Sequence, residues 1–431
     1  MIVSVSGLRC ITGKESLSTF FRVSYGFASK YCKEEILIGT DTRNTSQAIL
    51  RVVVGATLFA NKKPVILGTV STPAICRESR IKKKPAIMIT ASHNEPEWNG
   101  LKLILGGKSV EERILKSSLN PSDRGSLQVY NHVAYSSYRY NEDFLKRYKG
   151  NFSGMKVALD LGGGSAIFHA SKILSSLGCS IIQVNDKAGF FPRKIDPIED
   201  NLELLCYTVK ENNCDAGFAF DSDGDRLVMI DNRGRKLSGD RMLSAAIFHA
   251  MKHKNAKRVV ASLDTTLAVR DIVAAHKGRL YWSKVGEANV VKRIKQVKAD
   301  IGGEGSSGGL IDPSFNFCRD SLVAIYHILS CIKEIGERAF EIGSDYFQKR
   351  TKVSSNDINL NELASKFQKK YTVETMDGLK IWIDENTWVL IRKSNTENVV
   401  RISAESKSRK KTLLLARKFE KIVKGMTRKS E

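Results

Sequence analysis

The side chains best suited to chemistry lie in one short stretch behind an apolar run. The run Ala86–Ile89 predicts a buried strand, and the loop that follows it places Ser92 next to His93. A serine at a strand end is held rigidly, so it can be presented to a ligand as a nucleophile. We expect Asn99-Gly100 to turn the chain, which would bring the cation of Lys102 back to this loop. A satisfied polar turn is the alternative when the stretch is considered alone.

Three aspartates alternate with other residues between Asp221 and Arg226, directly after the apolar run Ala216–Phe220. In an extended loop, alternate side chains project to one side, and negative charges so close repel unless a cation neutralises them. Oxygen ligands suit a hard metal ion such as Mg²⁺. The pattern therefore favours a magnesium site over the alternative of an acidic hairpin turn that binds nothing. Its predicted protein ligands are Asp221, Asp223 and Asp225.

Two further loops have a composition that suits a phosphorylated sugar. The glycine-rich segment Gly302–Gly309 contains Glu304 and Ser306, whose oxygens can hold sugar hydroxyls. The segment Arg392–Glu397 combines cations, hydroxyls and loop amides, which together can hold a phosphate. A glycine-rich turn and an exposed polar hairpin are the simpler alternatives. Surface or helix-end charges are likewise the simpler interpretation of Arg9, Arg43 and Lys284.

Strand-like apolar runs alternate with helical patterns along most of the 431 residues, a length that indicates several domains. Such alternation predicts α/β layers with mostly parallel strands. It falls into three blocks of similar size. The C-terminal part, with strands at Trp388–Arg392 and Val399–Ala404 and a basic helical tail, predicts a smaller α+β domain. Linkers are expected near Lys149-Gly150, Lys252–Asn255 and Arg350–Asn356, and the predicted domains are residues 1–149, 150–252, 253–349 and 350–431.

Composition narrows the class of partner. The formal net charge of +23 fits nucleic-acid binding, an anionic small substrate or a solvated basic surface. The densest basic clusters, Lys82–Lys84 and Ser408–Lys411, lack interleaved aromatic residues, so we expect no specific nucleic-acid binding. The eight cysteines form no CxxC pair, which argues against a zinc site. Without a secretory signal or an apolar run that could span a bilayer, we expect no membrane partner and a cytoplasmic location.

Taken together and in this order, the four loops resemble those of the α-D-phosphohexomutase family, over a range from Ser6 to about Glu405, and most closely its archaeal-type members. Thr90–Asn94 resembles the family's active-serine loop, and Asp221–Arg226 resembles its metal loop. The resemblance implies three similar mixed α/β domains plus a smaller C-terminal α+β domain around a central active-site cleft. It also implies an isomerase, a phosphotransferase that interconverts hexose 6-phosphate and hexose 1-phosphate.

The resemblance assigns a role to each loop. Ser92 would be the phosphoserine that passes its phosphoryl group to a sugar phosphate, giving a hexose 1,6-bisphosphate intermediate, with Mg²⁺ as cofactor. The implied catalytic residues are Ser92, His93, Lys102 and Arg9. The implied metal ligands are Ser92, through its phosphate, and Asp221, Asp223 and Asp225. The implied substrate-binding residues are Arg226, Lys284, Glu304, Ser306, Arg392, Ser394, Asn395 and Thr396.

The chain departs from the family pattern at several positions. Glu95 separates Asn94 from the proline that usually follows it. In the phosphate loop, the usual proline, glycine and proline are replaced by Lys393, Asn395 and Asn398. Many members have Ser-Gly-His in the Gly-Glu loop, where this chain has Ser306-Ser307-Gly308-Gly309, and Glu287 stands where some relatives have histidine. Lys102 or His93 would then have to carry the proton, or solvent assisted by Arg9.

The glycine-rich form of the Gly-Glu loop resembles that of archaeal-type members assigned to glucosamine phosphate, so this resemblance makes glucosamine phosphate the first choice of sugar, with mannose and glucose phosphates as alternatives. A catalytically silent sugar-phosphate-binding relative is a further alternative, because the histidine is missing and the phosphate loop is altered. We expect a monomer or a homodimer.

Overall fold

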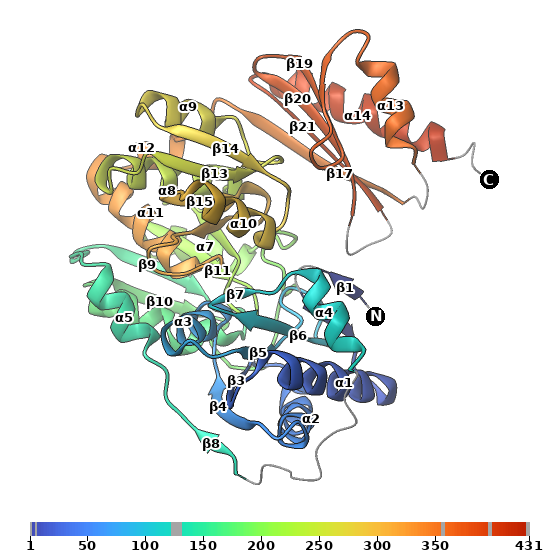
Figure 1. Ribbon diagram of the computed structural model, residues 1–431. Helices are drawn as coiled ribbons and strands as arrows, with labels where there is room; N and C mark the ends of the chain where they lie inside the picture. Colours follow the sequence, from blue (N-terminus) through green and yellow to red (C-terminus); the bar gives the residue numbers. More distant parts are fainter. Residues whose placement is uncertain (1, 5–6, 122–131, 355–357, 395–398, 428–431) are drawn as a thin grey trace.

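The computed structural model describes residues 2–4, 7–121, 132–354, 358–394 and 399–427, which form four sheets in chain order (Figure 1). The first three sheets are mixed and packed with helices, and the fourth is antiparallel with helices on one face. The predicted fold class, three mixed α/β units followed by a smaller α+β unit, is confirmed.

The first sheet has the order β1-β2-β6-β5-β3-β4-β8, with β7 paired to β6. Its strands are β1 (Ile2–Ser4), β2 (Gly7–Ile11), β3 (Glu35–Thr40), β4 (Lys63–Thr69), β5 (Ala86–Ile89), β6 (Trp98–Leu105), β7 (Lys108–Ser109) and β8 (Ala134–Tyr135). Side chains alternate between two cores along these strands. One core includes α1 (Lys14–Tyr31), α2 (Ser46–Phe59) and α4 (Glu112–Leu119), whereas the other includes α3 (Thr72–Lys82). Strand β5 is therefore buried on both faces, and it delivers Ser92 from a rigid support.

The expected turn at Asn99-Gly100 is wrong. Both residues lie inside β6, which pairs antiparallel with β2 and β5, and the chain turns earlier, where the Trp98 amide donates to the Glu95 carbonyl. Gly100 is needed for close packing, since a Cβ there would lie 2.2 Å from the carbonyl oxygen of Leu8. Lys102 still reaches the site, because the strand itself carries it there.

The second and third sheets share one pattern, with orders β10-β9-β11-β12 and β14-β13-β15-β16. In each, a central strand pairs parallel with two neighbours and a hairpin adds an antiparallel fourth strand. The strands are β9 (Lys156–Asp160), β10 (Ser180–Val184), β11 (Ala216–Phe220), β12 (Leu227–Ile230), β13 (Arg258–Ser262), β14 (Arg279–Ser283), β15 (Ile301–Glu304) and β16 (Gly309–Ile311). The helices of this region are α5 (Tyr140–Arg147), η1 (Ser165–Phe168), α6 (Ala170–Ser176), α7 (Glu203–Glu211), α8 (Gly239–His253), α9 (Ala268–Ala275), α10 (Glu287–Val297), η2 (Gly305–Ser307), α11 (Ser321–Ile335) and α12 (Arg338–Glu341).

The fourth sheet has the order β17-β21-β20-β19-β18. Its strands are β17 (Phe347–Ser354), β18 (Thr372–Glu374), β19 (Leu379–Asp384), β20 (Thr387–Lys393) and β21 (Val399–Ser406), and its helices are α13 (Leu360–Phe367) and α14 (Arg409–Thr427). The expectation of a linker from Arg350 is wrong as far as Ser354, because β17 pairs with β21 along its whole length. The remainder of that predicted linker lies outside the described residues. The predicted domain boundaries stay predictions.

One apolar core runs through the first three units, while a smaller cluster joins the third unit to the fourth. The larger core includes residues from α3, α6, α8 and α11, so these units pack against one another without a solvent layer between them. Among the described residues, no helix is both long and apolar enough to cross a membrane.

Candidate functional site

Ser92 is completely buried and has an unusual backbone conformation, with a φ of +52°. This left-handed conformation disfavours a residue with a Cβ by ~1–2 kcal/mol, so the surrounding contacts must hold it. The Ser92 amide donates to Thr90 Oγ1 over 2.8 Å. Its hydroxyl donates to Asp221 Oδ2 over 3.0 Å and lies 3.4 Å from His93 Nδ1. The hydroxyl is thus aimed at the three aspartates.

The guanidinium of Arg43 holds the backbone of the loop that carries Ser92. This group donates to the carbonyl oxygens of Ser92 (2.6 Å), Asn94 (2.7 Å) and Glu95 (2.6 Å), and its Nε pairs with Asp41 at 3.0 Å. The interpretation of Arg43 as a surface or helix-end charge is wrong, because only 2% of the residue is exposed. Its planar fork binds several carbonyl groups at once, which a lysine cannot do.

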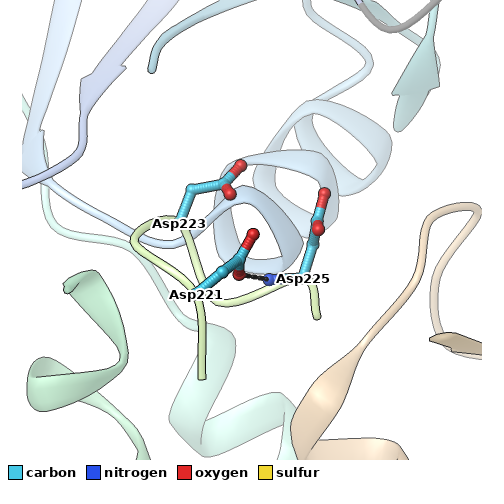
Figure 2. Close-up of side chains that lie close together, drawn as sticks. All are labelled: Asp221, Asp223 and Asp225. Carbon is cyan, nitrogen blue, oxygen red and sulfur yellow. Dashed lines mark hydrogen bonds between the residues drawn. The ribbon is translucent and has the colours of Figure 1, made fainter. Parts of the chain in front are cut away.

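The aspartate segment is a tight hairpin turn between β11 and β12, not the extended loop expected, and its carboxylates still converge (Figure 2). Gly224 makes the turn possible with a φ of +71°. Asp221 Oδ1 accepts the amides of Asp225 and Arg226, each over 3.1 Å. One ligand atom from each of Asp221, Asp223 and Asp225 lies within 4.8 Å of the others.

Two cations offset this cluster of negative charge. The Lys102 ammonium donates to Asp223 Oδ2 (2.6 Å) and Asp225 Oδ2 (2.7 Å), and Nη2 of Arg319 donates to both oxygens of Asp225 at 3.0 Å. Burial lowers the pKa of Lys102, but the two carboxylates outweigh burial and raise it above its usual range. Burial and the other two aspartates raise the pKa of Asp221 well above its ordinary value.

The residues present fit a divalent cation. All donors in the cluster are carboxylate oxygens, the ligands that Mg²⁺ prefers. Among the described residues, Asp223 Oδ1 is buried without a hydrogen-bond partner, an arrangement that costs free energy unless a ligand satisfies it. Lys102 and Arg319 pair with Asp223 and Asp225 but not with Asp221, whose raised pKa reflects burial and a repulsion between carboxylates that a bound dication would relieve.

His93, Arg226 and Arg9 line a cavity, whereas Ser92, next to His93 in the chain, is fully buried and is not part of the wall. Nη2 of Arg226 lies 3.3 Å from His93 Nε2, and because a guanidinium only donates, Nε2 must accept and the proton sits on Nδ1. Burial and the nearby cations Arg226 and Arg9 lower the pKa of His93 well below its usual value, so the imidazole is neutral. Arg9 donates to the Asn94 side chain over 2.7 Å, and burial lowers its pKa to about 10.

The Gly-Glu loop is the hairpin between β15 and β16. Glu304 is buried, and its Oε1 accepts the Gly286 amide over 2.6 Å. Burial raises the pKa of Glu304, and Arg319, 3.5 Å from Oε2, opposes that effect. Ser306 is half-buried in the same hairpin. The carboxylate and the hydroxyl both face a common cavity.

That cavity has a volume of about 470 Å³, within the range of small-molecule sites, and each of the four units contributes residues to its wall. Basic side chains outnumber acidic ones in the wall, which suits an anionic ligand. Its basic residues are Arg9, Arg226, Arg319, Arg350, Lys352, Arg392 and Arg401, and its acidic residues are Asp196, Glu199, Asp264, Glu287 and Glu304.

The cavity wall contains seven of the predicted residues, whereas Ser92, Lys102 and the three aspartates form the buried cluster and do not line it. Arg392 and Ser394 of the predicted phosphate loop line the cavity, whereas Lys284 is exposed and is not part of the wall. Asn395 and Thr396 lie outside the described residues. Sequence reasoning missed Arg319 and Asp264, both in the wall, because each is an isolated charge outside any recognisable motif.

Comparison with known proteins agrees with this arrangement. Four phosphoglucomutase/phosphomannomutase domain models match the chain, domain I at residues 1–118, domain II at 135–234, domain III at 238–349 and the C-terminal domain at 351–422. A protein of Methanococcoides burtonii named probable phosphoglucosamine mutase is 30% identical, covering 93% of this chain and 94% of its own length. A phosphoglucomutase/phosphomannomutase of Thermococcus kodakarensis is 28% identical, covering 94% of each chain.

Among solved structures, a phosphoglucomutase/phosphomannomutase family protein from Burkholderia thailandensis superposes with a TM-score of 0.83. The two chains are 20% identical, and the match covers 99% of this chain and 97% of the other. The similarity thus extends over the whole fold. The chain belongs to the phosphoglucomutase/phosphomannomutase family, and it is an enzyme of the phosphohexomutase class.

Proposed function

We propose that this enzyme interconverts glucosamine 6-phosphate and glucosamine 1-phosphate through a phosphorylated Ser92. One observation carries the proposal: the Ser92 hydroxyl lies 3.0 Å from Asp221 in the aspartate cluster, and the adjacent His93 lines a basic cavity to which all four units contribute. A serine that carried out acyl transfer would need a base within reach to activate it. Here Ser92 donates to a carboxylate that belongs to the predicted metal site, which suits phosphoryl transfer.

We assign Mg²⁺ to Asp221, Asp223 and Asp225, where it would neutralise charge that develops on the transferred phosphoryl group. The chain supplies the rest of the positioning. Lys102 and Arg319 orient the carboxylates, and the loop tied down by Arg43 holds Ser92. Phosphoryl transfer depends mainly on such positioning and charge stabilisation.

The reaction needs two transfers of opposite direction. In the first, the bond between Ser92 Oγ and phosphorus breaks and a bond forms to the free C1 or C6 hydroxyl oxygen of the sugar phosphate. The proton of that hydroxyl passes to a nearby base, and the released Ser92 Oγ takes up a proton. This gives hexose 1,6-bisphosphate. After the sugar reorients, its other phosphoryl group returns to Ser92 and the product leaves. Lys102 and His93 stay the predicted proton carriers, and because the pKa of Lys102 lies above its usual range and that of His93 well below, Lys102 can donate a proton and neutral His93 can accept one.

The phosphate that does not react needs its own site in both orientations. We assign this site to Arg392, Ser394, Asn395 and Thr396, of which Arg392 and Ser394 are described and line the cavity. Arg392 also lies 3.8 Å from Asp377, so its guanidinium is already oriented by a carboxylate. Glu304 and Ser306 are assigned to the sugar hydroxyls.

Two observations favour glucosamine phosphate. The Methanococcoides burtonii relative bears the name phosphoglucosamine mutase, and the cavity wall contains Asp264, which is 7% exposed. Asp264 Oδ1 accepts from Ser262 over 2.6 Å, and in the described part of the chain its other oxygen accepts no hydrogen bond. A carboxylate in this state suits the ammonium group of an amino sugar. Glucose and mannose phosphates are the alternatives that the Thermococcus kodakarensis name supports.

A panel of hexose 6-phosphates tests the proposal. We expect kcat/KM for glucosamine 6-phosphate to exceed the values for glucose, mannose and N-acetylglucosamine 6-phosphates by about tenfold or more, since one favourable charge pair contributes on the order of 1–3 kcal/mol. Equal activity on the neutral sugars would reassign the substrate within the class. Absence of 1-to-6 phosphate exchange on every sugar would refute the proposed function.

A further inference from the structure

Arg319, which immediately precedes Asp320, the N-cap of α11, stands between three site loops. Its guanidinium contacts Asp225 of the metal loop at 3.0 Å, Glu304 of the Gly-Glu loop at 3.5 Å and Glu287 at 3.3 Å. The Arg319 amide also donates to Glu287 over 3.0 Å. Only 9% of Arg319 is exposed, and it lines the cavity with Glu287 and Glu304, whereas Asp225 is buried and does not line it. Among the described residues, Arg319 is thus the single cation that contacts both the metal loop and the Gly-Glu loop.

The side chain of Arg319 occupies a particular space. Gly309 pairs with Glu304 across the β15–β16 hairpin, so a side chain at position 309 would lie beside Glu304. A Cβ built on Gly309 would meet Cδ of Arg319 at 2.2 Å, Cγ at 2.6 Å and Cβ at 3.2 Å. Arg319 fills the volume that such a side chain would use.

We propose that Arg319, lodged in the side-chain space of Gly309, is a positioning residue that joins the metal loop to the Gly-Glu loop by holding Asp225 and Glu304 in one fixed arrangement. It replaces the missing cross-strand neighbour of Glu304 with a group from another part of the chain. The role is positioning and not proton transfer, because the three carboxylates outweigh burial and raise the pKa of Arg319 well above its already high value.

The fork of a guanidinium matters for this role. Nη2 spans both oxygens of Asp225 while Nη1 and Nε face Glu304 and Glu287, and a lysine ammonium is a point charge that cannot reach all three. Arg319→Lys should therefore keep the charge and lose the arrangement. The functional part of this inference rests on the proposed action on a hexose phosphate, whereas the steric part does not.

The steric part is tested by thermal unfolding of a double-mutant cycle. Gly309→Ala should lower Tm by about 5 °C in the wild-type background, because the new Cβ collides with Arg319. In an Arg319→Ala background, Gly309→Ala should lower Tm by less than half as much, since only the contact with Cβ of residue 319 at 3.2 Å remains. An equal Tm loss in both backgrounds would show that Arg319 does not fill this space, and would overturn the proposal.

The functional part is tested with Arg319→Lys, so it does not depend on the alanine variant being folded. Binding of glucosamine 6-phosphate is measured by calorimetry in a Ser92→Ala background, where no turnover occurs, with and without Mg²⁺. The matched control is Arg77→Lys, because Arg77 pairs with Asp143 at 3.2 Å and donates to the Phe315 carbonyl outside the cavity.

We expect Arg319→Lys to weaken sugar-phosphate binding by tenfold or more and to abolish any effect of Mg²⁺ on it, whereas the control changes the Kd by less than twofold. Equal changes in the two variants would overturn the proposal. If the Ser92→Ala protein with native Arg319 binds none of the hexose phosphates, the proposed function fails instead, and the steric cycle still decides where Arg319 lies.

Discussion

At the level of single residues, the site is a balance of buried charges around Ser92. Asp221 accepts the serine hydroxyl, and Lys102 and Arg319 hold the other two aspartates. Burial opposes ionisation of Asp225, but Arg319 and Lys102 outweigh it and lower the pKa of that carboxyl below its usual range. Asp225 is therefore ionised at neutral pH, whereas burial and the other aspartates raise the pKa of Asp221, an effect that a bound divalent cation would oppose.

Replacement of Arg43 by lysine tests how the Ser92 loop is held. Arg43→Lys removes most hydrogen bonds to the carbonyls of Ser92, Asn94 and Glu95, so the strained serine should shift. We expect kcat to fall about 100-fold, the usual effect of a displacement near 1 Å, and the free energy of unfolding to fall by ~2–3 kcal/mol. Steady-state kinetics and urea unfolding measure the two effects. Arg51→Lys is the control, since Arg51 is exposed on α2 and should change neither. Unchanged kcat in Arg43→Lys would contradict this role.

Asp264→Asn tests the assignment of the sugar. The amide keeps the shape of the side chain but removes the charge that we assign to an ammonium group. We expect kcat/KM for glucosamine 6-phosphate to fall ~10–100-fold, equivalent to ~1.4–2.7 kcal/mol, and the value for glucose 6-phosphate to change less than threefold. A parallel loss on both sugars would show that Asp264 only supports the local fold.

Residues in contiguous motifs were predictable from the sequence, and isolated ones were not. Ser92 and the aspartates stand in short segments whose chemistry is local, and all four meet in space as expected. Arg319 becomes visible only when the fold brings it to Asp225, which is 94 positions away in the chain. No spacing rule links residues so far apart.

At the level of elements, three sheets place their functional loops at one equivalent position. In each sheet, a parallel strand is followed by an antiparallel neighbour, and the loop between them carries the side chains: β5–β6 carries Ser92, β11–β12 the aspartates and β15–β16 Glu304. Loops at the ends of rigid strands are precise supports for catalytic groups.

A pair of glycine substitutions tests the support given by β6. Gly100→Ala would place a Cβ 2.2 Å from the Leu8 carbonyl and push apart the strands that carry Arg9 and Lys102, so we expect the free energy of unfolding to fall by ~2 kcal/mol or more. Gly55→Ala, in the middle of α2 with open space around it, should instead raise it by ~0.5–1 kcal/mol. Urea unfolding measures both. A neutral Gly100→Ala would mean that β2 and β6 can separate freely.

The apolar runs Ala86–Ile89 and Ala216–Phe220, from which buried strands were predicted, match β5 and β11 residue for residue. The misassigned elements have mixed faces. Strand β17 is rich in Lys and Arg and, among its residues, only Val353 is buried, so its sequence lacks the apolar signal of a strand. Its position is set by pairing with β21, which local sequence cannot show.

At the level of the whole molecule, an aromatic cluster around a buried lysine packs the fourth sheet against the third unit. The Lys380 ammonium lies over the rings of Trp282, Trp382 and Trp388, at 4.9, 4.7 and 4.2 Å from their centroids, and donates to the Leu263 carbonyl. Because the fourth sheet carries Arg392, this contact sets the position of the predicted phosphate loop relative to Ser92.

Glu405 makes this contact sensitive to pH. Burial raises the pKa of Glu405 to about 7 from its ordinary value of 4.5, and its Oε1 accepts from Trp388 and the Leu267 amide. The folded state thus binds the Glu405 proton more tightly than the unfolded chain does. The stabilisation that comes from this proton is fully present below pH 4.5 and is lost as pH rises to about 7. The full effect is about 3 kcal/mol. Burial lowers the pKa of Lys380 to about 8, so the titration of Lys380 affects stability at pH values above this range.

We therefore expect Tm to fall between pH 5 and pH 7.5, and Glu405→Gln to remove most of that dependence. Differential scanning calorimetry at both pH values measures it. A variant with the same slope as the wild type would show that another group titrates.

The central claim is that Ser92 carries the phosphoryl group. Intact-mass measurement of the wild-type protein after incubation with hexose 1,6-bisphosphate should show one added phosphoryl group, which disappears when glucosamine 6-phosphate is supplied. The Ser92→Ala protein should remain unmodified and inactive. Equal phosphorylation or full activity of Ser92→Ala would contradict the account.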